Sequence, residues 1–483
     1  MIQNRTERDA LQRAETKHMS QVFEAQQAAF STERYPTLDA RIDRLVRLRT
    51  MLEQGSEAIV TAVSQDFGHR SPDESRIAEI AGTIAAIDYA IDRVRRWMHP
   101  SGRHATIWFL PAGNQVIAQP VGVVGIIAPW NYPVNLAFVP LVSALAAGNR
   151  VMIKMSELSP ATSEMLADLA GQFFNISELA IVGGDAEEAA YFSSLPFGHL
   201  LFTGSSRVGR MVMSAAAQNL TPVTLELGGK CPAIVDSDYD LDEAAKRILW
   251  GKTFNAAQTC VAPDYVMVPK GKAVAFVEAM TRHFRVSYPE GALSSQYTSI
   301  IDERGYARLM GLVDTAKRHG AEIRTCEPIT AEHHRLRKFP LTFVLNPSKD
   351  SALMQHEIFG PVLPVLEHEG LDDALRHVNQ GDHPLALYYF GHSSKKRSSV
   401  LMQSLSGGVA FNDVMLQFLQ VDMAFGGVGA SGFGRYHGRE GFETFSHLKS
   451  VFTQRGVGNF TGLKLLYPPY GRLERLVTTL MGG

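Results

Sequence analysis

The feature that most constrains the fold is a regular alternation of short apolar segments and helical patterns that begins at residue 121. Val121–Ala128 is continuously apolar, as a strand buried on both faces would be. The strands expected after it, each followed by a turn or a helical pattern, are Val151–Lys154, Leu179–Val182, His199–Thr203 and Val223–Leu227. Because short strands that alternate with helices form parallel βαβ units, the sequence predicts an α/β protein with a doubly wound sheet in this half.

The pattern restarts after Leu227 and predicts a second α/β unit. Its expected strands are Ala233–Asp236, Tyr265–Pro269, Leu341–Leu345, Val362–Glu367, Ala386–Phe390 and Gly408–Phe411, with helices at Asp242–Ala256 and Lys272–Arg285. A chain of 483 residues is too long for one core, so two or three domains are expected. We place the first domain in residues 18–102 and 121–225 and the second in residues 226–413.

The remaining segments are expected to lie outside these two domains. Residues 1–17 are polar and are predicted to form a frayed, flexible arm, and Thr37 is expected to cap the first long helix. Ala105–Leu110 and Gln115–Gln119 are predicted to pair as a hairpin. Such a hairpin often projects toward another subunit, so residues 103–120 and 414–483 are assigned to a bridging segment.

Composition narrows the classes of function. The net charge of -2 supplies no large field that would attract nucleic acid or an anionic membrane. The three cysteines are too few for a disulfide framework, lack the paired spacing of a zinc site and suit a reducing cytoplasm. No apolar run approaches the ~20 residues of a spanning helix. We therefore expect a soluble cytoplasmic protein without a metal, nucleic-acid or membrane partner.

Cys260 lies where an amphipathic helix should break before a strand. A free cysteine is more often an inert small hydrophobe than a nucleophile, and that alternative stays open unless other residues serve the thiol. Asn131 and Glu226 are two residues that could serve the thiol. Asn131 is either a turn residue or a donor to a developing oxyanion. Glu226 ends an apolar strand, where burial would raise its pKa toward that of a general base.

Two further segments suggest a nucleotide. Leu201–Gly209 follows a strand and opens a helix, where free N–H groups and the helix dipole favour a pyrophosphate. Its spacing is not Gly-x-Gly-x-x-Gly, so a plain strand–turn–helix is the alternative. Glu157 follows another strand, where its carboxylate would accept ribose hydroxyls and repel a 2′-phosphate. A solvated surface glutamate is the alternative there.

Together these segments resemble the aldehyde dehydrogenase family, in the expected order, from about residue 37 to about residue 470. The motifs that carry the resemblance are Pro129-Trp-Asn-Tyr-Pro133, Phe202-Thr-Gly-Ser205, Leu225-Glu-Leu-Gly-Gly-Lys230, Gln258-Thr-Cys260, Glu357-Ile-Phe-Gly-Pro361 and Phe425-Gly-Gly-Val428. Thr259–Tyr265 and Tyr436–Phe442 resemble more narrowly the class 3 branch of fatty and coniferyl aldehyde enzymes. Asp66–Arg70 resembles the bacterial coniferyl aldehyde dehydrogenases.

The resemblance implies a Rossmann-type cofactor domain, an α/β catalytic domain and a hairpin that helps to form a homodimer. It implies NAD as cofactor, with NADP possible. The implied reaction oxidises an aldehyde, aromatic such as coniferyl aldehyde or medium-chain aliphatic, to the carboxylic acid. Cys260 would be the nucleophile that forms a thiohemiacetal and then a thioester. Asn131 would hold the oxyanion, Glu226 would be the base, and Lys252 would help to position or activate that base.

The resemblance also implies a set of cofactor-binding residues, namely Lys154, Glu157, Gly204, Ser205, Gly209, Glu357 and Phe359. Glu357 competes with Glu226 for the role of base in class 3 relatives. Two departures from the family pattern bear on the site. Met155 replaces a proline, and Ala257 replaces a glycine close to Cys260. A methyl group at residue 257 is compatible only with a negative φ.

Two rival functions remain. A CoA-acylating enzyme of the same fold would clear the thioester with a thiol, whereas a carboxylate such as Glu226 favours hydrolysis by water. A catalytically silent binding or structural homologue is the other rival, and the joint presence of Cys260, Glu226 and Asn131 favours an active enzyme instead.

Overall fold

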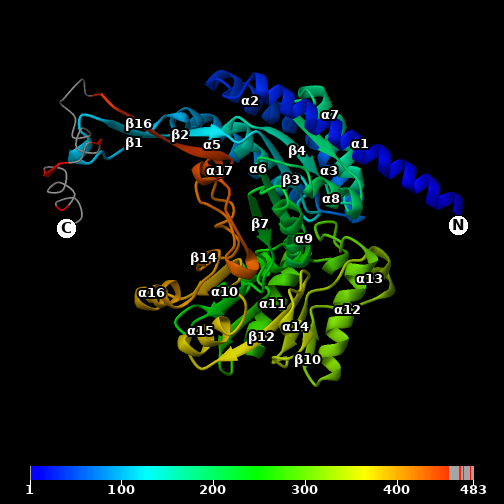
Figure 1. Ribbon diagram of the computed structural model, residues 1–483. Helices are drawn as coiled ribbons and strands as arrows, with labels where there is room; N and C mark the ends of the chain where they lie inside the picture. The colour runs from blue at the N-terminus through cyan, green and yellow to red at the C-terminus, as the bar shows by residue number, and fades with distance from the viewer. Residues whose placement is uncertain (1, 456–466, 469–470, 473–478, 480–483) are drawn as a thin grey trace.

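The computed structural model describes residues 2–455, 467–468, 471–472 and 479, and builds the protein around two sheets that lie one above the other (Figure 1). The first sheet has the strand order β15-β7-β6-β3-β4-β5. Its strands are β3 (Val123–Ile127), β4 (Arg150–Lys154), β5 (Leu179–Val182), β6 (His199–Gly204), β7 (Val223–Leu227) and β15 (Gly432–Phe433). All are parallel except β15. The doubly wound order predicted from the sequence is confirmed.

The second sheet has the order β10-β11-β12-β9-β8-β13-β14. Its strands are β8 (Pro232–Val235), β9 (Tyr265–Pro269), β10 (Glu322–Thr325), β11 (Thr342–Leu345), β12 (Val362–His368), β13 (Ala386–Phe390) and β14 (Gly408–Phe411). Only β10 runs antiparallel to its neighbour, and the sequence does not predict it. Three of its four residues are polar, and all four are exposed or half-buried at the sheet edge, so no apolar run marks it.

Helices cover both sheets. Those before and around the first sheet are α1 (Ile2–Thr32), α2 (Leu38–Gln54), α3 (Ser56–Phe67), α4 (Pro72–Ser75), the π-helix η1 (Arg76–Ala81), α5 (Gly82–Met98), α6 (Asn135–Ala147), α7 (Pro160–Phe173), α8 (Ala186–Ser193), α9 (Ser206–Ala217) and α17 (Gly438–Thr444). Those around the second are α10 (Leu241–Thr253), α11 (Ala273–Ser287), α12 (Glu303–Arg318), α13 (Ala331–Leu336), α14 (Ala352–Gln355), α15 (Leu371–Asn379) and α16 (Ser394–Gln403). Short 3₁₀ turns are η2 (Ile107–Phe109), η3 (Phe254–Ala257), η4 (Gly291–Leu293) and η5 (Gly429–Ser431).

The N-terminal segment corrects one prediction. Residues 1–17 were expected to be frayed, but α1 is helical from Ile2, and its N-terminal end projects beyond the body of the protein (Figure 1). The later part of α1 docks on the first sheet. Phe23 is buried and meets Phe197 edge-on at 5.2 Å, and Gln26 donates to the carbonyl oxygen of Val151 at 2.9 Å. Packing of one face therefore fixes a helix whose composition is polar.

A small third sheet projects from the body and joins two distant parts of the chain (Figure 1). It consists of β1 (Ser101–Arg103), β2 (Gly113–Pro120) and β16 (Ser446–Thr453), all antiparallel. The hairpin is present, but its first strand lies earlier than predicted. Residues 107–109 form a 3₁₀ turn instead of a strand. Within the segment 414–483, residues 456–466, 469–470, 473–478 and 480–483 lie outside the described part of the chain.

The two sheets are connected at the point where the sequence predicts a restart. β7 continues to Leu227, so Glu226 belongs to the first sheet although we began the second domain at residue 226. Gly228 and Gly229 then carry the chain to β8. The chain returns near its end, because Gly432 of β15 pairs with Glu226. The carboxyl ends of β3, β6 and β7 thus face residues of the second domain.

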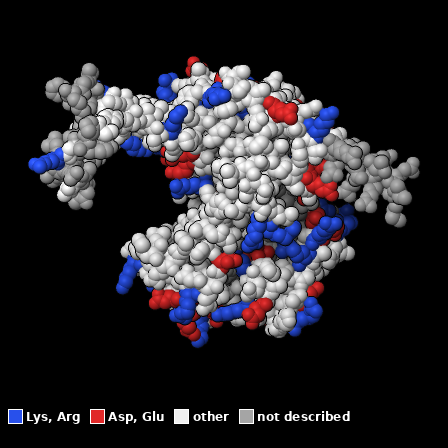
Figure 2. Space-filling view, in the orientation of Figure 1, with Lys and Arg blue, Asp and Glu red and all other residues white. Residues whose placement is uncertain are grey.

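The surface of the protein carries side chains of both charges. Positive and negative side chains are interspersed over most of the visible face, and the body is hollowed between its upper and lower halves (Figure 2). Among the residues that the structure describes, no helix combines the length and the apolar character needed to cross a bilayer.

Candidate active site

A cavity of about 540 Å³ lies beyond the carboxyl ends of β3, β6 and β7, which is where open α/β sheets bind ligands. The second domain closes it with residues from α12 and from the segment before β12. The predicted site residues that line this cavity are Asn131, Gly204, Ser205, Glu226, Cys260, Glu357 and Phe359. The structure therefore brings together most of the set that the sequence singles out.

Cys260 sits at the junction of two cavities. It lines the large one and also a smaller, apolar one on its other side. Burial, followed by the charges of Glu357 and Glu226, raises the pKa of the thiol to about 12, while the main-chain N–H groups of Cys260 and Val261 oppose that rise. Without a nearby cation the thiol is neutral at physiological pH. A positive charge in the large cavity would favour the thiolate.

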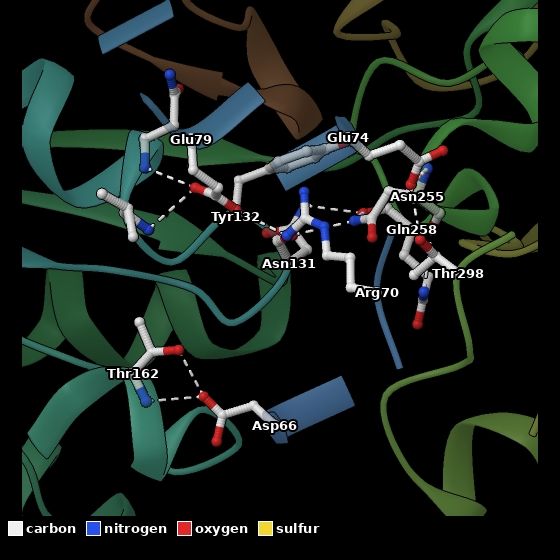
Figure 3. Close-up of polar contacts among 12 residues, drawn as sticks. Asp66, Arg70, Glu74, Glu79, Asn131, Tyr132, Thr162, Asn255, Gln258 and Thr298 are labelled. Carbon is white, nitrogen blue, oxygen red and sulfur yellow. Dashed lines mark hydrogen bonds and ion pairs between the residues drawn. The ribbon is translucent and has the colours of Figure 1, made fainter. Parts of the chain in front are cut away.

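Asn131 is tied at both ends. Its carbonyl oxygen accepts from Nη1 of Arg70 at 3.1 Å and from Nδ2 of Asn255 at 3.0 Å. Its own Nδ2 donates to the carbonyl oxygen of Gln258 at 3.1 Å, two residues before the nucleophile (Figure 3). An amide group carries two N–H donors, so one remains for a ligand. Asn131 is thus both a turn residue and a fixed donor at the cavity wall.

Glu226 is buried without a hydrogen-bond partner for either carboxylate oxygen among the described residues. Burial raises its pKa well above the ordinary value. A buried polar group with no partner costs free energy, and such exceptions call for an explanation. Its position on the wall of the large cavity supplies one, because a ligand or water there would complete its hydrogen bonding.

Glu357 is held against the Gly-Gly turn after β7. A Cβ on Gly228 would lie 2.0 Å from its Oε2, so any larger residue there would displace the carboxylate. Burial, followed by the charge of Asp264, raises the pKa of Glu357 to about 8, while the Gly229 N–H, Lys230 and Arg308 act against the rise. Phe359 follows with a φ of 50° and meets the ring of Trp130 edge-on at 5.4 Å.

Four predicted residues lie outside the large cavity, and Lys252, Lys154 and Gly209 line neither that cavity nor the apolar one beside Cys260. Lys252 is buried on α10, where burial lowers its pKa to about 8. Lys154 donates to the carbonyl oxygens of Met155 and Gly184, at 2.8 and 2.7 Å, and so holds the turn after β4. Gly209 lies on α9, where a Cβ would come within 2.8 Å of Leu227. Gly209 allows this helix to approach β7 and does not line the phosphate turn.

Glu157 lines a separate cavity of about 380 Å³ at the carboxyl end of β4. Glu164 and Ser163 of α7 line it as well. The start of α7 is fixed by Asp66, which accepts from the main-chain and side-chain groups of Thr162 at 2.9 and 2.6 Å (Figure 3). Ser159 is the N-cap residue of α7 but makes no side-chain cap hydrogen bond. Two carboxylates in this cavity would accept ribose hydroxyls and repel a phosphate.

Sequence reasoning missed the wall residues that carry no distinctive local signal. Arg308 of α12 lines the large cavity and donates to the carbonyl oxygen of Ile358 at 2.6 Å, which fixes the segment that holds Glu357. The apolar cavity beside Cys260 was also missed. Its aromatic lining residues are Tyr132, Trp250, Phe254 and Phe418. They come from three separate segments, since Trp250 and Phe254 are close in sequence, so only the fold brings them together.

The donors and acceptors of the large cavity and of the Glu157 cavity fit a nicotinamide dinucleotide. Glu157 and Glu357 can each accept the hydroxyls of one ribose, and the N-terminus of α9, with Ser205, lies between them as a site for phosphates. Thr203 Oγ1 is buried without a partner among the described residues and lines the large cavity. The wall of that cavity therefore carries buried oxygen atoms, from Thr203 and Glu226, that a ligand or water could hydrogen bond.

The turn before Cys260 corrects the expectation for Ala257. Asn255, Ala256 and Ala257 all have positive φ, of 51°, 49° and 54°. The turn is held by Asn255, whose N–H donates to Glu74 at 3.1 Å, and by Gln258, whose Nε2 donates to the Asn255 carbonyl at 3.0 Å. Each alanine in this left-handed region costs roughly 1–2 kcal/mol, and the hydrogen bonds of Asn255 and Gln258 offset this strain in the loop before Cys260.

Glycine at residue 257 should relieve that strain. We expect Ala257→Gly to be about 1–2 kcal/mol less destabilising than Ala245→Gly, a buried alanine in the right-handed helix α10. Both changes delete one buried methyl group, so the difference reports the backbone. Equilibrium unfolding in urea measures it, and equal losses would show that the turn is not strained.

Glu226→Gln should lower kcat by about 100-fold or more, because the amide cannot take a proton. Steady-state kinetics measures this loss.

The same variant should also differ from the parent in how its stability depends on pH. The raised pKa means that the folded protein binds this proton more tightly than the unfolded chain, so stability falls as pH rises above the ordinary value of 4.5. We expect the variant to unfold at higher temperature than the parent at about pH 9 and to show no such gain at about pH 4. A pH-independent difference would contradict the burial of an ionisable group.

Comparison with known proteins places this geometry in a family. The model of the aldehyde dehydrogenase family matches residues 3–451. A protein of Pseudomonas aeruginosa named probable coniferyl aldehyde dehydrogenase is 47% identical over 96% of this chain and 97% of its own length. The coniferyl aldehyde dehydrogenase of Pseudomonas sp. strain HR199 is 44% identical over 92% of each chain.

Solved structures agree. Staphylococcus aureus AldH in a substrate-bound state has a TM-score of 0.89 and 33% identity, over 96% of this chain and 99% of that chain. A Mycobacterium tuberculosis aldehyde dehydrogenase complexed with NAD+ has a TM-score of 0.81 and 27% identity, over 90% of each chain. The family model, the identities and the shared fold show that this chain belongs to the aldehyde dehydrogenase family.

Proposed function

We propose that this enzyme oxidises phenolic aromatic aldehydes to carboxylic acids with NAD as the electron acceptor. The observation that carries the proposal is that Cys260 lines two cavities with different kinds of lining residues. One holds carboxylates and a helix N-terminus suited to a dinucleotide, and the other is lined by aromatic rings. An aldehyde that enters from the aromatic side meets the thiol opposite the place where a cofactor would bind.

The chemistry of the chain's own residues follows from this arrangement. The Cys260 thiolate adds to the aldehyde carbon, and the carbonyl oxygen becomes an oxyanion within reach of the Asn131 amide and the Cys260 N–H. Such a donor is typically worth about 3–4 kcal/mol. Bound NAD would supply the hydride acceptor and a positive charge beside the thiol. Loss of hydride from the thiohemiacetal leaves a thioester on Cys260, which water cleaves to the acid and the free thiol.

Glu226 is the better candidate for the base in the hydrolytic step. Its two oxygens have no partner among the described residues. Glu357, in contrast, accepts a hydrogen bond from the Gly229 N–H and interacts with the charge of Arg308. An unpartnered carboxylate is free to take a proton from water. Glu357 with Phe359 then serves the nicotinamide end of the cofactor. Lys252 acts on this centre through its charge.

The aromatic cavity favours a phenolic substrate. A further cavity adjoins it, because Asn135, Phe418 and Leu419 line both. His437 lines the far one and is buried, and the main chain of Met423 is the hydrogen-bonding group near its ring. Burial lowers its pKa to about 4, against the effect of Met423, so the ring is neutral and keeps a nitrogen that can accept from a phenol hydroxyl. The names of the Pseudomonas relatives support the same class.

NAD is favoured over NADP by the adenosine-side cavity. Glu157 and Glu164 both line it, and their charges would disfavour a 2′-phosphate.

The proposal also includes a homodimer and a cytoplasmic location. Leu448 and Phe452 are exposed on β16 of the projecting sheet, which suits a homodimer contact. Three unpaired cysteines suit the cytoplasm.

The experiment that tests the proposal measures NADH formation by the purified protein with coniferaldehyde. We expect turnover with NAD that does not depend on CoA, and none with Cys260→Ala, because the thiol is the nucleophile. A rate that requires CoA would establish the acylating rival. Equal and negligible rates for the parent and Cys260→Ala, across aromatic and medium-chain aldehydes, would establish the silent rival.

The role of His437 in specificity has its own test. His437→Phe keeps the ring volume and removes both nitrogens, so it should lower kcat/KM for coniferaldehyde about tenfold relative to cinnamaldehyde, which lacks the hydroxyl. A loss of the same size for both aldehydes would mean that His437 shapes the cavity without binding the hydroxyl.

A further inference from the structure

A fully buried ion pair lies behind the proposed oxyanion site. Nη1 of Arg70 is 2.7 Å from Oε1 of Glu79, and both side chains are shielded completely from solvent (Figure 3). Glu79 lies on the π-helix η1, and Arg70 lies in the segment between α3 and α4. Neither residue lines a cavity given above. Neither is used by the chemistry proposed above.

The pair grips both ends of the segment that carries Asn131. Nη1 of Arg70 also donates to the Asn131 carbonyl at 3.1 Å. The second oxygen of Glu79 accepts from the N–H groups of Val134 and Asn135, at 3.1 and 2.9 Å, where α6 begins. One ion pair thus fixes the chain between the end of the Asn131 turn and the first residue of the helix.

A second buried carboxylate grips the nucleophile loop in the same way. Oε2 of Glu74 accepts from the Asn255 N–H at 3.1 Å and from the Thr298 hydroxyl at 2.6 Å. Nδ2 of Asn255 donates to the carbonyl oxygens of Asn131 and Gln258, at 3.0 and 3.2 Å. The Asn131 carbonyl therefore receives one donor from the Arg70 side and one from the nucleophile loop.

Stability alone is a poor reason for this arrangement. Two charges removed from water lose hydration that their attraction only partly restores, and apolar residues of similar size are often as stable. Arg70 shows the cost directly, because its Nε and Nη2 are buried without partners among the described residues. The rings of Phe67 and Tyr132 flank its guanidinium at 5.2 and 4.8 Å and compensate in part.

We propose that Arg70 is a positioning residue for catalysis, held in place by Glu79 and acting through the main-chain carbonyl of Asn131. The inference rests on the oxyanion role of Asn131 proposed above. With the carbonyl fixed from two sides, the Asn131 amide keeps its direction relative to the Cys260 loop. Loss of Arg70 removes one of the two restraints on this carbonyl, so the amide, which is still hydrogen bonded to Gln258, can shift away from the oxyanion.

The first test removes the charges together, so that no unpaired ion stays buried. Arg70→Met with Glu79→Gln keeps the side-chain volumes and an acceptor for the start of α6. We expect kcat to fall about 10- to 100-fold and KM for the aldehyde to stay within about twofold, because a misdirected donor affects the transition state more than binding. Arg70→Lys keeps the charge and should recover part of kcat. It also keeps the test usable if the paired variant does not fold.

Two readouts separate positioning from general damage. In an Asn131→Ala background the same changes should lower kcat by no more than about twofold, because the side-chain amide that Arg70 orients is gone. The rate at which iodoacetamide alkylates Cys260 should stay that of the parent, since alkylation needs no oxyanion donor. Arg44→Met is the matched control. Arg44 is also a buried arginine and pairs with Glu33 and Glu178, away from both cavities. We expect it to change stability and leave kcat unchanged.

The outcomes distinguish the two claims. If Asn131→Ala retains full kcat, its oxyanion role fails and the Arg70 proposal fails with it. If Asn131→Ala is impaired but the Arg70 variants keep parental kcat, or lower it by the same factor with and without Asn131, Arg70 has only a structural role. A fall in alkylation rate that parallels kcat would likewise overturn the proposal.

Discussion

The burial of Cys260, Glu226 and Glu357 around one cavity is the constraint on which the rest of the site depends. Desolvation raises the pKa of all three groups, and the two carboxyl groups raise that of the thiol further. In the protein alone, burial therefore favours the protonated form of each group. A cation that enters the cavity would shift all of them toward their charged forms, so the site is poised to become reactive when a cofactor binds.

Holding such a site requires a rigid frame built from both sheets. β7 supplies Glu226 and the glycines against which Glu357 packs, and the second domain supplies the loop of Cys260. The loop adopts a left-handed turn that alanine tolerates poorly. Buried hydrogen bonds from Glu74, Gln258 and Asn255 offset the strain. Strain near a nucleophile persists only where surrounding contacts over-determine the backbone, and these contacts do so.

Much of this was predictable because strong local signals mark it. Apolar runs place the parallel strands, and the cavity lies at their carboxyl ends as strand order requires. The motifs around Asn131, Glu226 and Cys260 place the reacting groups. What the sequence did not predict depends on contacts between distant segments. The edge strand β10 and the docking of the later part of α1 depend on packing, and the positive φ of Ala257 on the hydrogen bonds that Asn255 makes with Glu74 and Gln258. The Arg70–Glu79 pair joins segments with no shared pattern.

The central claim is that Cys260 carries the acyl group during aldehyde oxidation. The most direct measurement mixes the enzyme with NAD and coniferaldehyde, quenches it in acid during turnover and determines the mass of the Cys260 peptide. The account predicts a mass increase equal to the feruloyl group on that peptide, larger in Glu226→Gln because hydrolysis is slowed. NADH formation without any acyl group on Cys260, in the parent and in that variant, would contradict it.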